Sequence, residues 1–196
     1  MSILARSSHG THTHGILKDD SFETQHAQEA TSYALSTTAR QALALLRVAF
    51  GFTFLWAFVD KMFGLGYSTK SADSWLNGGS PTTGFLKFGA KGPFKSFYNS
   101  IAGDAWVNVL FMAALFALGV ALILGIGMKL AGIGGTILYL MMWTVAMPPE
   151  NNPIIDEHIL GAISIAVLSL TMAGNTWGLG KAWGRTAIAT SFPILR

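Results

Sequence analysis

The chain has 196 residues, of which 51% are hydrophobic and only 12% are charged. A soluble domain carries about 25% charged residues, so this composition does not fit a soluble surface. The absence of cysteine excludes disulfides, iron–sulfur clusters, covalently attached haem and thiol nucleophiles. The net charge of +3 is spread over loops and helix ends, which gives no indication of nucleic acid binding.

The first 37 residues are polar, rich in Ser, Thr and His, and without helical periodicity, so we predict a flexible N-terminal tail. Three of its histidines, His9, His12 and His14, could take up a metal ion weakly. No carboxylate or cysteine completes a site there, so we expect no metal centre in the chain. His158 is the only histidine outside the tail, which argues against a haem held by two histidines.

Four apolar blocks follow, each of about 17–23 residues and long enough to cross roughly 30 Å of hydrocarbon. The blocks are Leu43–Val59, Trp106–Met128, Leu130–Met147 and Ile159–Leu179. They predict an all-α integral membrane protein, a four-helix bundle of up-down-up-down topology. The expected membrane domain spans residues 38–183, followed by a C-terminal tail over residues 184–196. The predicted helices cover residues 38–63, 104–127, 129–147 and 153–173, and Asn152 is expected to cap the last of them, with Pro153 at its first position.

A segment of about 40 residues, 64–103, separates the first two predicted helices. Connections of this length are usually functional or disordered. Pro81 and Pro93 predict the first turns of short helices within it. Its aromatic residues alternate with lysines, a pattern typical of a segment in the lipid headgroup region. Two interpretations stay open, a binding segment at the interface or a lid that only covers the bundle. The aromatic residues are Trp75, Phe85, Phe88, Phe94, Phe97 and Tyr98.

The basic residues that flank the predicted helices favour one orientation in the cell membrane. Arg40, Lys129, Lys181 and Arg185 fall at the end of the bundle that also holds both termini. Lysine and arginine near helix ends mark the cytoplasmic side. We therefore expect a multi-pass protein with both termini in the cytoplasm. The acidic connection between the third and fourth helices is then expected outside.

Three titratable residues, Asp156, Glu157 and His158, stand directly before the last apolar block. Glu157 aligns with Gly161 and Ser164, a small-residue stripe that lets helices approach, so we expect Glu157 to face inward. Two interpretations are open. The three groups could merely cap and orient the helix, or they could form a catalytic, proton-handling site in which His158 accepts the proton.

In an up-down-up-down bundle, the end of the first helix meets the start of the fourth. This arrangement brings Asp60 and Lys61 toward His158, with Trp56 and Trp143 at similar depth. Ionisable groups at membrane depth are usually paired and often functional. We predict that Lys61, Asp60, Trp56 and Trp143 bind a quinone headgroup at the outer face.

Arg47 is the one charged residue inside the first apolar block. It could reach lipid phosphates, or pair with polar groups such as Asn175 at the cytoplasmic end of the last helix. We interpret Arg47 as a structural anchor rather than a catalytic residue.

Four motifs in this order resemble the DoxX/DoxD-like membrane protein family, and most closely its actinobacterial branch. They are LLRVAFGFTFLWAFVDKMFG, SADSWLNGGSPTTGFL, PPENNPIIDEHI and AGNTWGLGKAW, and the resemblance covers about residues 39–183. The positions that match the family pattern are Arg47, Trp56, Asp60, Lys61, Asn151, Asn152, Pro153, Asp156 and His158.

The resemblance implies a four-helix membrane protein. Some relatives are subunits of a thiosulfate:quinone oxidoreductase, and others belong to membrane-associated oxidoreductase assemblies. It implies a subunit of a quinone-linked oxidoreductase or respiratory assembly that hosts a quinone and protons while a partner subunit supplies the electrons. The alternative is a non-catalytic accessory subunit of a larger respiratory complex. A transporter is a weaker alternative, because inverted repeats and paired broken helices are not seen.

Overall fold

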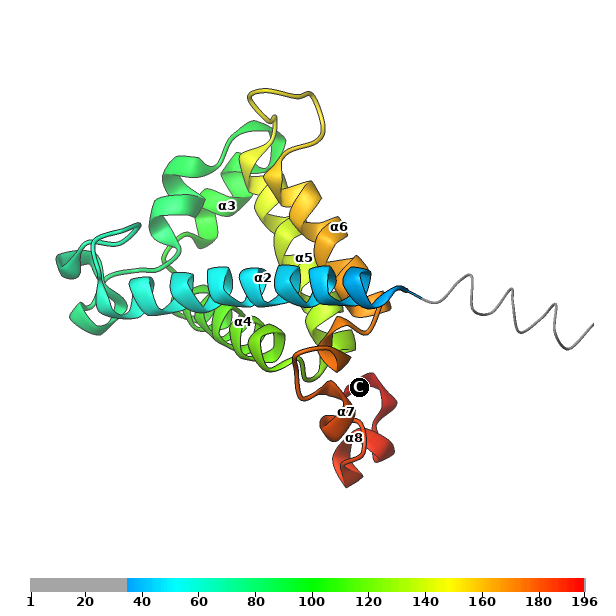
Figure 1. The fold of residues 1–196 in the computed structure, drawn as a ribbon. Coiled ribbons are helices and arrows are strands. Elements are labelled where there is room, and N and C mark those ends of the chain that lie inside the picture. The colour runs from blue at the N-terminus through cyan, green and yellow to red at the C-terminus, as the bar shows by residue number, and fades with distance from the viewer. Residues whose placement is uncertain (1–34, 196) are drawn as a thin grey trace, which may run out of the picture. The chain divides into compact units, whose positions relative to one another are not determined.

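The structure is a computed structural model that describes residues 35–195 of the chain. Every regular element in this range is helical, and the range contains no strand (Figure 1). The histidines of the predicted N-terminal tail, His9, His12 and His14, lie outside the described residues, as does nearly all of that tail. The helices from Thr37 onward belong to one compact unit.

Three of the described helices are long and apolar enough to cross a membrane. They are α2 (Thr37–Phe63), α4 (Ala105–Leu124) and α5 (Met128–Ala146). A fourth apolar helix, α6 (Glu157–Leu170), has 14 residues. At about 1.5 Å per residue it rises roughly 21 Å, which is less than the roughly 30 Å of a hydrocarbon core.

The outward faces of these four helices are apolar. Phe52, Leu110, Ile137 and Ile163 are each more than half exposed, and none of the four helices carries a polar outer stripe of the kind that a soluble bundle needs. Exposed apolar surface on this scale is costly in water. The three long helices and these faces together indicate a lipid bilayer as the environment of the chain.

Helices α2 and α4 pack against each other in antiparallel directions, and two glycines make the close approach possible. A Cβ atom at Gly119 would lie 2.8 Å from the backbone nitrogen of Leu55, and one at Gly51 would lie 2.8 Å from the backbone nitrogen of Ile123. Only glycine therefore fits at these two positions. Small residues of this kind are the usual means by which helices approach in lipid.

Helices α5 and α6 form a second antiparallel pair that uses the same device. A Cβ atom at Gly135 would lie 3.0 Å from Ile165, and one at Gly161 would lie 2.7 Å from the ring of Tyr139. In Figure 1, α5 and α6 run side by side while α2 crosses them. The two pairs share one core, formed by Phe54, Met112, Leu115, Leu118, Leu122, Met128, Ala131, Ile165, Leu168 and Ala173.

The segment between α2 and α4 is more ordered than the predicted loop. It contains short 3₁₀ turns at Ser71–Asp73, Trp75–Asn77 and Gly92–Phe94, a π-helical turn at Gly84–Gly89, and the helix α3 (Lys95–Ile101). Pro93 lies in the first turn of its element, as predicted.

This segment packs onto the end of α5. Tyr98 is buried against Val145, and its hydroxyl lies 2.5 Å from that of Thr144. The backbone N–H of Lys91 donates to the carbonyl of Val145 at 3.0 Å. The segment is therefore part of the fold, held by a small core of its own.

Three predicted helix bounds need correction, two of them in the last helix. The last helix begins at Glu157 instead of 153, because Asp156 rather than Asn152 provides its N-cap. The side chain of Asn152 instead accepts hydrogen bonds from the N–H groups of Ile154 and Ile155, both at 2.9 Å, and closes a turn before the helix. This helix also ends at Leu170, three residues before the predicted end.

The second predicted helix ends at Leu124, not at 127, because Gly125 adopts a left-handed conformation with φ of 72°. Such a residue ends a helix at little cost when it is glycine. The predicted C-terminal tail is not featureless either. After α7 (Gly180–Trp183) it contains α8 (Ala187–Ser191) and a 3₁₀ turn at Pro193–Leu195.

Candidate functional site

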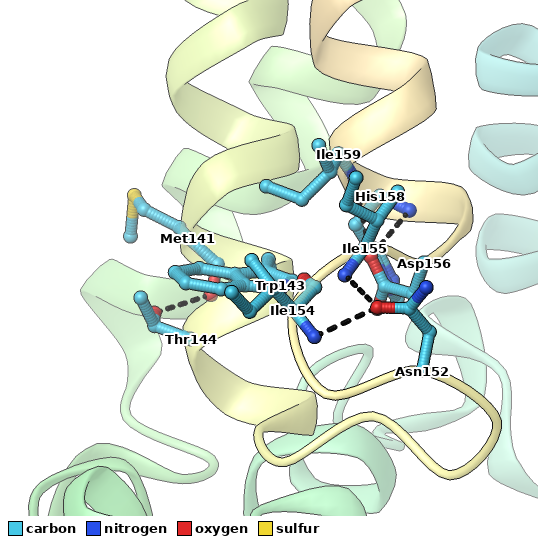
Figure 2. A network of polar contacts seen from close by, with 9 residues as sticks. All are labelled: Met141, Trp143, Thr144, Asn152, Ile154, Ile155, Asp156, His158 and Ile159. Carbon is cyan, nitrogen blue, oxygen red and sulfur yellow. Dashed lines mark hydrogen bonds and ion pairs between the residues drawn. The ribbon is translucent and has the colours of Figure 1, made fainter.

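The candidate site is built on the first turn of α6, where Asp156 positions His158. One carboxylate oxygen of Asp156 accepts hydrogen bonds from the backbone N–H groups of His158 at 3.0 Å and Ile159 at 3.1 Å. The other oxygen lies 2.9 Å from the Nδ1 atom of His158 (Figure 2). Only 11% of the His158 side chain and 10% of the Asp156 side chain are exposed. One carboxylate therefore both caps the helix and fixes the imidazole ring.

The electrostatics of this pair favour an ionised aspartate. Burial acts to raise the pKa of Asp156, but the hydrogen bonds from the His158 ring and from the two backbone N–H groups outweigh it and hold the pKa below its ordinary value. A carboxylate beside Nδ1 accepts a hydrogen bond from the Nδ1–H group, which leaves Nε2 as the basic nitrogen of the neutral ring. Nε2 has no hydrogen bond to any residue in the described part of the chain.

Tyr139 on α5 faces this pair and was not identified from the sequence. Its ring centre lies 6.5 Å from that of His158 and 5.5 Å from that of Phe54, and Phe50 also contacts it. Gly161 leaves the space that the tyrosine ring occupies. The sequence does hold a signal, since Tyr139 stands inside an apolar block, four residues before Trp143 and on the same helix face.

Trp143 lies beside the turn that leads into α6. Its Nε1 donates a hydrogen bond of 2.8 Å to the carbonyl of Ile154, so its N–H group is already used (Figure 2). Trp143 thus ties α5 to the connection before α6. It could offer a bound molecule its ring face but not a hydrogen bond.

Glu157 does not face inward as the sequence predicted, because it is exposed. The buried face of α6 contains His158, Gly161, Ala162 and Ile165 instead. Successive residues in a helix turn by about 100°, so the spacing of three, four and seven from His158 defines this face. The alignment of Glu157 with Gly161 places it at the border of the buried face, on the outer side.

Asp156, Glu157 and His158 have potential ligand atoms within 4.8 Å of one another. The oxygens of Asp156, however, already accept two backbone hydrogen bonds and face Nδ1 of His158. A cation at this position would have to replace the contacts that start the helix. The geometry is that of a helix cap with a bound imidazole.

The end of α2 does not share a hydrogen bond or ion pair with this pair within the described range. Asp60 is buried and instead accepts hydrogen bonds from the hydroxyl of Ser68 at 2.6 Å, from its N–H at 2.9 Å, and from the N–H of Tyr67 at 3.3 Å. Trp56 meets the ring of Tyr67 edge-on, with ring centres 5.1 Å apart. Asp60 and Trp56 therefore stabilise the turn after α2. Lys61, the next residue in the sequence after Asp60, is half-buried.

Arg47 is fully buried at the opposite ends of the helices. Within residues 35–195, its guanidinium donates only to backbone carbonyls, which lie at the end of α4 and in the turn after α6. These acceptors are Leu122, Ile123 at 2.9 Å, Thr176 at 3.3 Å and Trp177 at 2.9 Å. The last carbonyls of a helix carry partial negative charge, which a cation stabilises. The geometry supports the structural interpretation of Arg47, with backbone carbonyls as its partners in place of the side chain of Asn175.

The predicted site residues thus divide into two groups. Asp156, Glu157 and His158 lie together at the start of α6 with Trp143 beside them, while Trp56, Asp60 and Lys61 lie at the end of α2. Comparison of the chain with protein-family models, with curated proteins and with solved structures finds no match.

Proposed function

We propose that the chain is a multi-pass membrane subunit of a quinone-linked oxidoreductase or respiratory assembly, as its resemblance to DoxX/DoxD-like proteins implies. The observation that carries the proposal is the buried His158, whose Nδ1 faces Asp156 and whose Nε2 has no partner among the described residues. Ionisable groups that lie at membrane depth are commonly proton carriers. Histidine is the side chain best suited to exchange protons near neutral pH.

The proposed architecture is a four-helix, up-down-up-down bundle in which α6 and the turn after it complete the fourth crossing, with Asp156 at the outer membrane boundary. The antiparallel pairs α2–α4 and α5–α6 support this order. The segment before α4 would lie in the lipid headgroups, which the exposed rings of Phe88 and Phe97 support.

Both termini are proposed to be cytoplasmic, on the side of the basic residues around Lys129 and Lys181. The chain has no cysteine, so single cysteines at the exposed Ser100 and Thr190 can be labelled with an impermeant thiol reagent on intact cells. We expect labelling at Ser100 only. Labelling at Thr190 only would reverse the orientation.

The proposed ligand is a quinone headgroup held beside His158. Apolar walls with a few placed polar groups are typical of such sites, and Phe50, Phe54 and Tyr139 provide the apolar wall. His158 Nε2 and the Tyr139 hydroxyl are the two polar groups that no described residue occupies. A bound quinone supplies two-electron, two-proton chemistry. A partner subunit would supply the electrons, since this chain has no cysteine for an iron–sulfur cluster.

The role of the chain's own residues is to hold and move a proton. When Nε2 takes up a proton the ring becomes an imidazolium, and the Asp156 carboxylate at 2.9 Å from Nδ1 stabilises that charge. Asp156 is a positioning residue, because it also fixes the ring through the helix cap. Lys61 and Asp60 have no role in this version of the site.

One observation favours the second candidate function, a non-catalytic accessory subunit. Every hydrogen bond of Asp156 stays within the first turn of α6, as expected if the cluster only caps the helix. The exposed aromatic residues before α4 would then serve to dock a partner subunit.

Replacement of His158 distinguishes the two candidates. His158→Gln in the full chain, purified in mild detergent, should lower the affinity for a short-chain ubiquinone by about tenfold, the effect of losing one good hydrogen bond. The unfolding midpoint should change little. Glu157→Gln is the matched control, since Glu157 is exposed on the adjacent position. Unchanged quinone binding in His158→Gln would refute the site and favour the accessory subunit.

A further inference from the structure

Two adjoining cavities lie at the end of the molecule opposite His158, around the turn that follows α6. Their volumes are about 390 and 260 Å³, and they share Met172, Asn175 and Lys181. Arg40 lines the larger cavity and Arg185 the smaller one. Among the described residues, lysine and arginine are thus the only ionisable residues that line the two cavities, and the remaining polar groups are amide and hydroxyl side chains.

The acidic residues of the described chain gather at one of its two ends. The end with these cavities carries Arg40, Arg47, Lys129, Lys181 and Arg185, and no acidic residue in the described range. The acidic residues of that range all lie in or next to the opposite half, at Asp60, Asp73, Asp104, Glu150, Asp156 and Glu157. Five lysines lie in that half with them, at Lys61, Lys70, Lys87, Lys91 and Lys95. No described carboxylate is therefore placed to neutralise Lys181 or Arg185, and the electrostatic potential at these two residues favours an anion.

A third, apolar cavity of about 370 Å³ continues from this basic region along α4 and α5. It shares Gly127 and Trp183 with the smaller basic cavity. Small residues on the two helices, including Ala117 on α4 and Gly134 on α5, leave the groove open, and a Cβ atom at Gly134 would meet no atom within 4 Å. The indole N–H of Trp183 donates to the carbonyl of Leu195, which fixes the ring at the junction.

We propose that this end of the protein binds an anionic phospholipid. The phosphate would lie between Lys181 and Arg185, and one acyl chain would lie in the groove between α4 and α5. Charged donors recognise phosphate oxygens strongly, and clusters of basic residues at a membrane surface attract anionic lipids. The groove distinguishes a lipid from a free phosphate, since only a lipid uses both regions. This site is separate from His158, so it does not depend on the proposed quinone function.

The headgroup can be tested with charge variants of the full-length protein in lipid-depleted detergent. We expect phosphatidylglycerol to raise the unfolding midpoint and to remain bound in native mass spectrometry, while phosphatidylcholine with the same acyl chains does neither. The double variant Lys181→Gln/Arg185→Gln should bind phosphatidylglycerol roughly 30-fold more weakly, as expected for two charges near a membrane surface. The double variant Lys87→Gln/Lys95→Gln, which changes two exposed lysines before α4, is the matched control and should bind normally.

The acyl chain can be tested separately. Ala117→Phe fills the groove, whereas Ala113→Phe adds the same ring one turn earlier, outside the lining residues. Only Ala117→Phe should weaken phosphatidylglycerol binding.

If inorganic phosphate stabilises the protein as well as the lipid does, or if Ala117→Phe binds normally, the site is one for a small anion and the lipid proposal is wrong. Equal binding of phosphatidylcholine, or normal binding by the lysine–arginine variant, would also overturn it. Should the double variant not fold, Lys181→Gln and Arg185→Gln alone should each show about a fivefold loss.

Discussion

Arg47 on α2 and His158 on α6 are both buried polar groups, and they lie at opposite ends of the membrane helices. Their environments differ in kind. The guanidinium of Arg47 contacts carbonyls that lie 75 to 130 residues away in sequence. In the part of the chain that the structure describes, the ring of His158 forms a hydrogen bond only with Asp156, two residues before it. Arg47 therefore exists in its present form only when three distant segments have assembled, whereas the His158–Asp156 pair can form with the first turn of α6.

This difference separates a structural group from one that is available for chemistry. Both outer nitrogens of the Arg47 guanidinium are used by carbonyls, and only its Nε lacks a partner among the described atoms. His158 keeps one ring nitrogen without a described partner, beside the ring of Tyr139. A group such as Arg47, with nearly all of its donors in hydrogen bonds, stabilises the fold. A group such as His158, with one ring nitrogen that has no described partner, can bind a proton or a ligand.

The comparison predicts its largest effect for Arg47→Leu. The substitution leaves four backbone carbonyls without their donor, and each buried acceptor left unsatisfied costs about 1–3 kcal/mol. We expect a loss of on the order of 4 kcal/mol or more in the free energy of unfolding, and most of the protein not recovered in folded form. The measurement is the yield of monodisperse protein after detergent extraction, together with its unfolding midpoint.

The control for this prediction is Arg185→Leu, which removes an exposed arginine at the same end, with both variants measured in lipid-depleted detergent. It should change the free energy of unfolding by only about 0.5 kcal/mol or less. An Arg47→Leu protein with normal yield and normal midpoint, but without activity, would transfer Arg47 from the structural to the functional group.

A smaller effect is expected where α2 and α4 touch, between the two ends. Gly119→Ala places a Cβ atom 2.8 Å from the backbone of Leu55, so the helices must separate, at a cost of about 1–3 kcal/mol. Gly134→Ala makes the same chemical change where no atom lies within 4 Å, so it should be neutral or slightly stabilising. The difference between the unfolding midpoints of the two variants measures the cost of the steric clash between α2 and α4 separately from the effect of replacing glycine by alanine in a helix. Equal midpoints would show that the close contact does not limit stability.

The sequence was sufficient to predict the helices, because their signal is local and strong. The start and end of α2 and α5 agree within one residue with the predicted 38–63 and 129–147. The start of α6 was predicted four residues too early because Asn152 and Asp156 are both good capping residues. The choice between them depends on backbone hydrogen bonds that the sequence does not display.

The candidate site was predictable only where its contacts are local. The pair of Asp156 and His158 was identified because the two residues are close in sequence. Tyr139 was missed, since only the packing of α5 on α6 brings it to His158. The predicted approach of Asp60 and Lys61 to His158 was inferred from helix order alone, and no hydrogen bond or ion pair among the described residues joins them to His158. Asp60 bonds instead to Ser68, eight residues along the chain.

The smallest expected effect concerns Asp156 and depends on pH. Loss of an N-cap costs about 1 kcal/mol, so Asp156→Ala should lower the free energy of unfolding by about that amount at pH 7. The pKa of Asp156 is lower in the folded state than in the unfolded chain, so its contribution is complete above about pH 4 and is lost as the pH falls through the folded-state pKa. The difference in the free energy of unfolding between the wild type and Asp156→Ala should therefore shrink in acid.

Asp156→Asn keeps a good capping oxygen that does not titrate, so it should retain most of the stability and lose this pH dependence. The cost of Arg47→Leu should stay constant over the same range, since a guanidinium and backbone carbonyls do not titrate there. A cost of Asp156→Ala that is equally constant down to pH 3 would mean that the ionised carboxylate has no part in holding His158, and the contrast between the two ends would then rest on geometry alone.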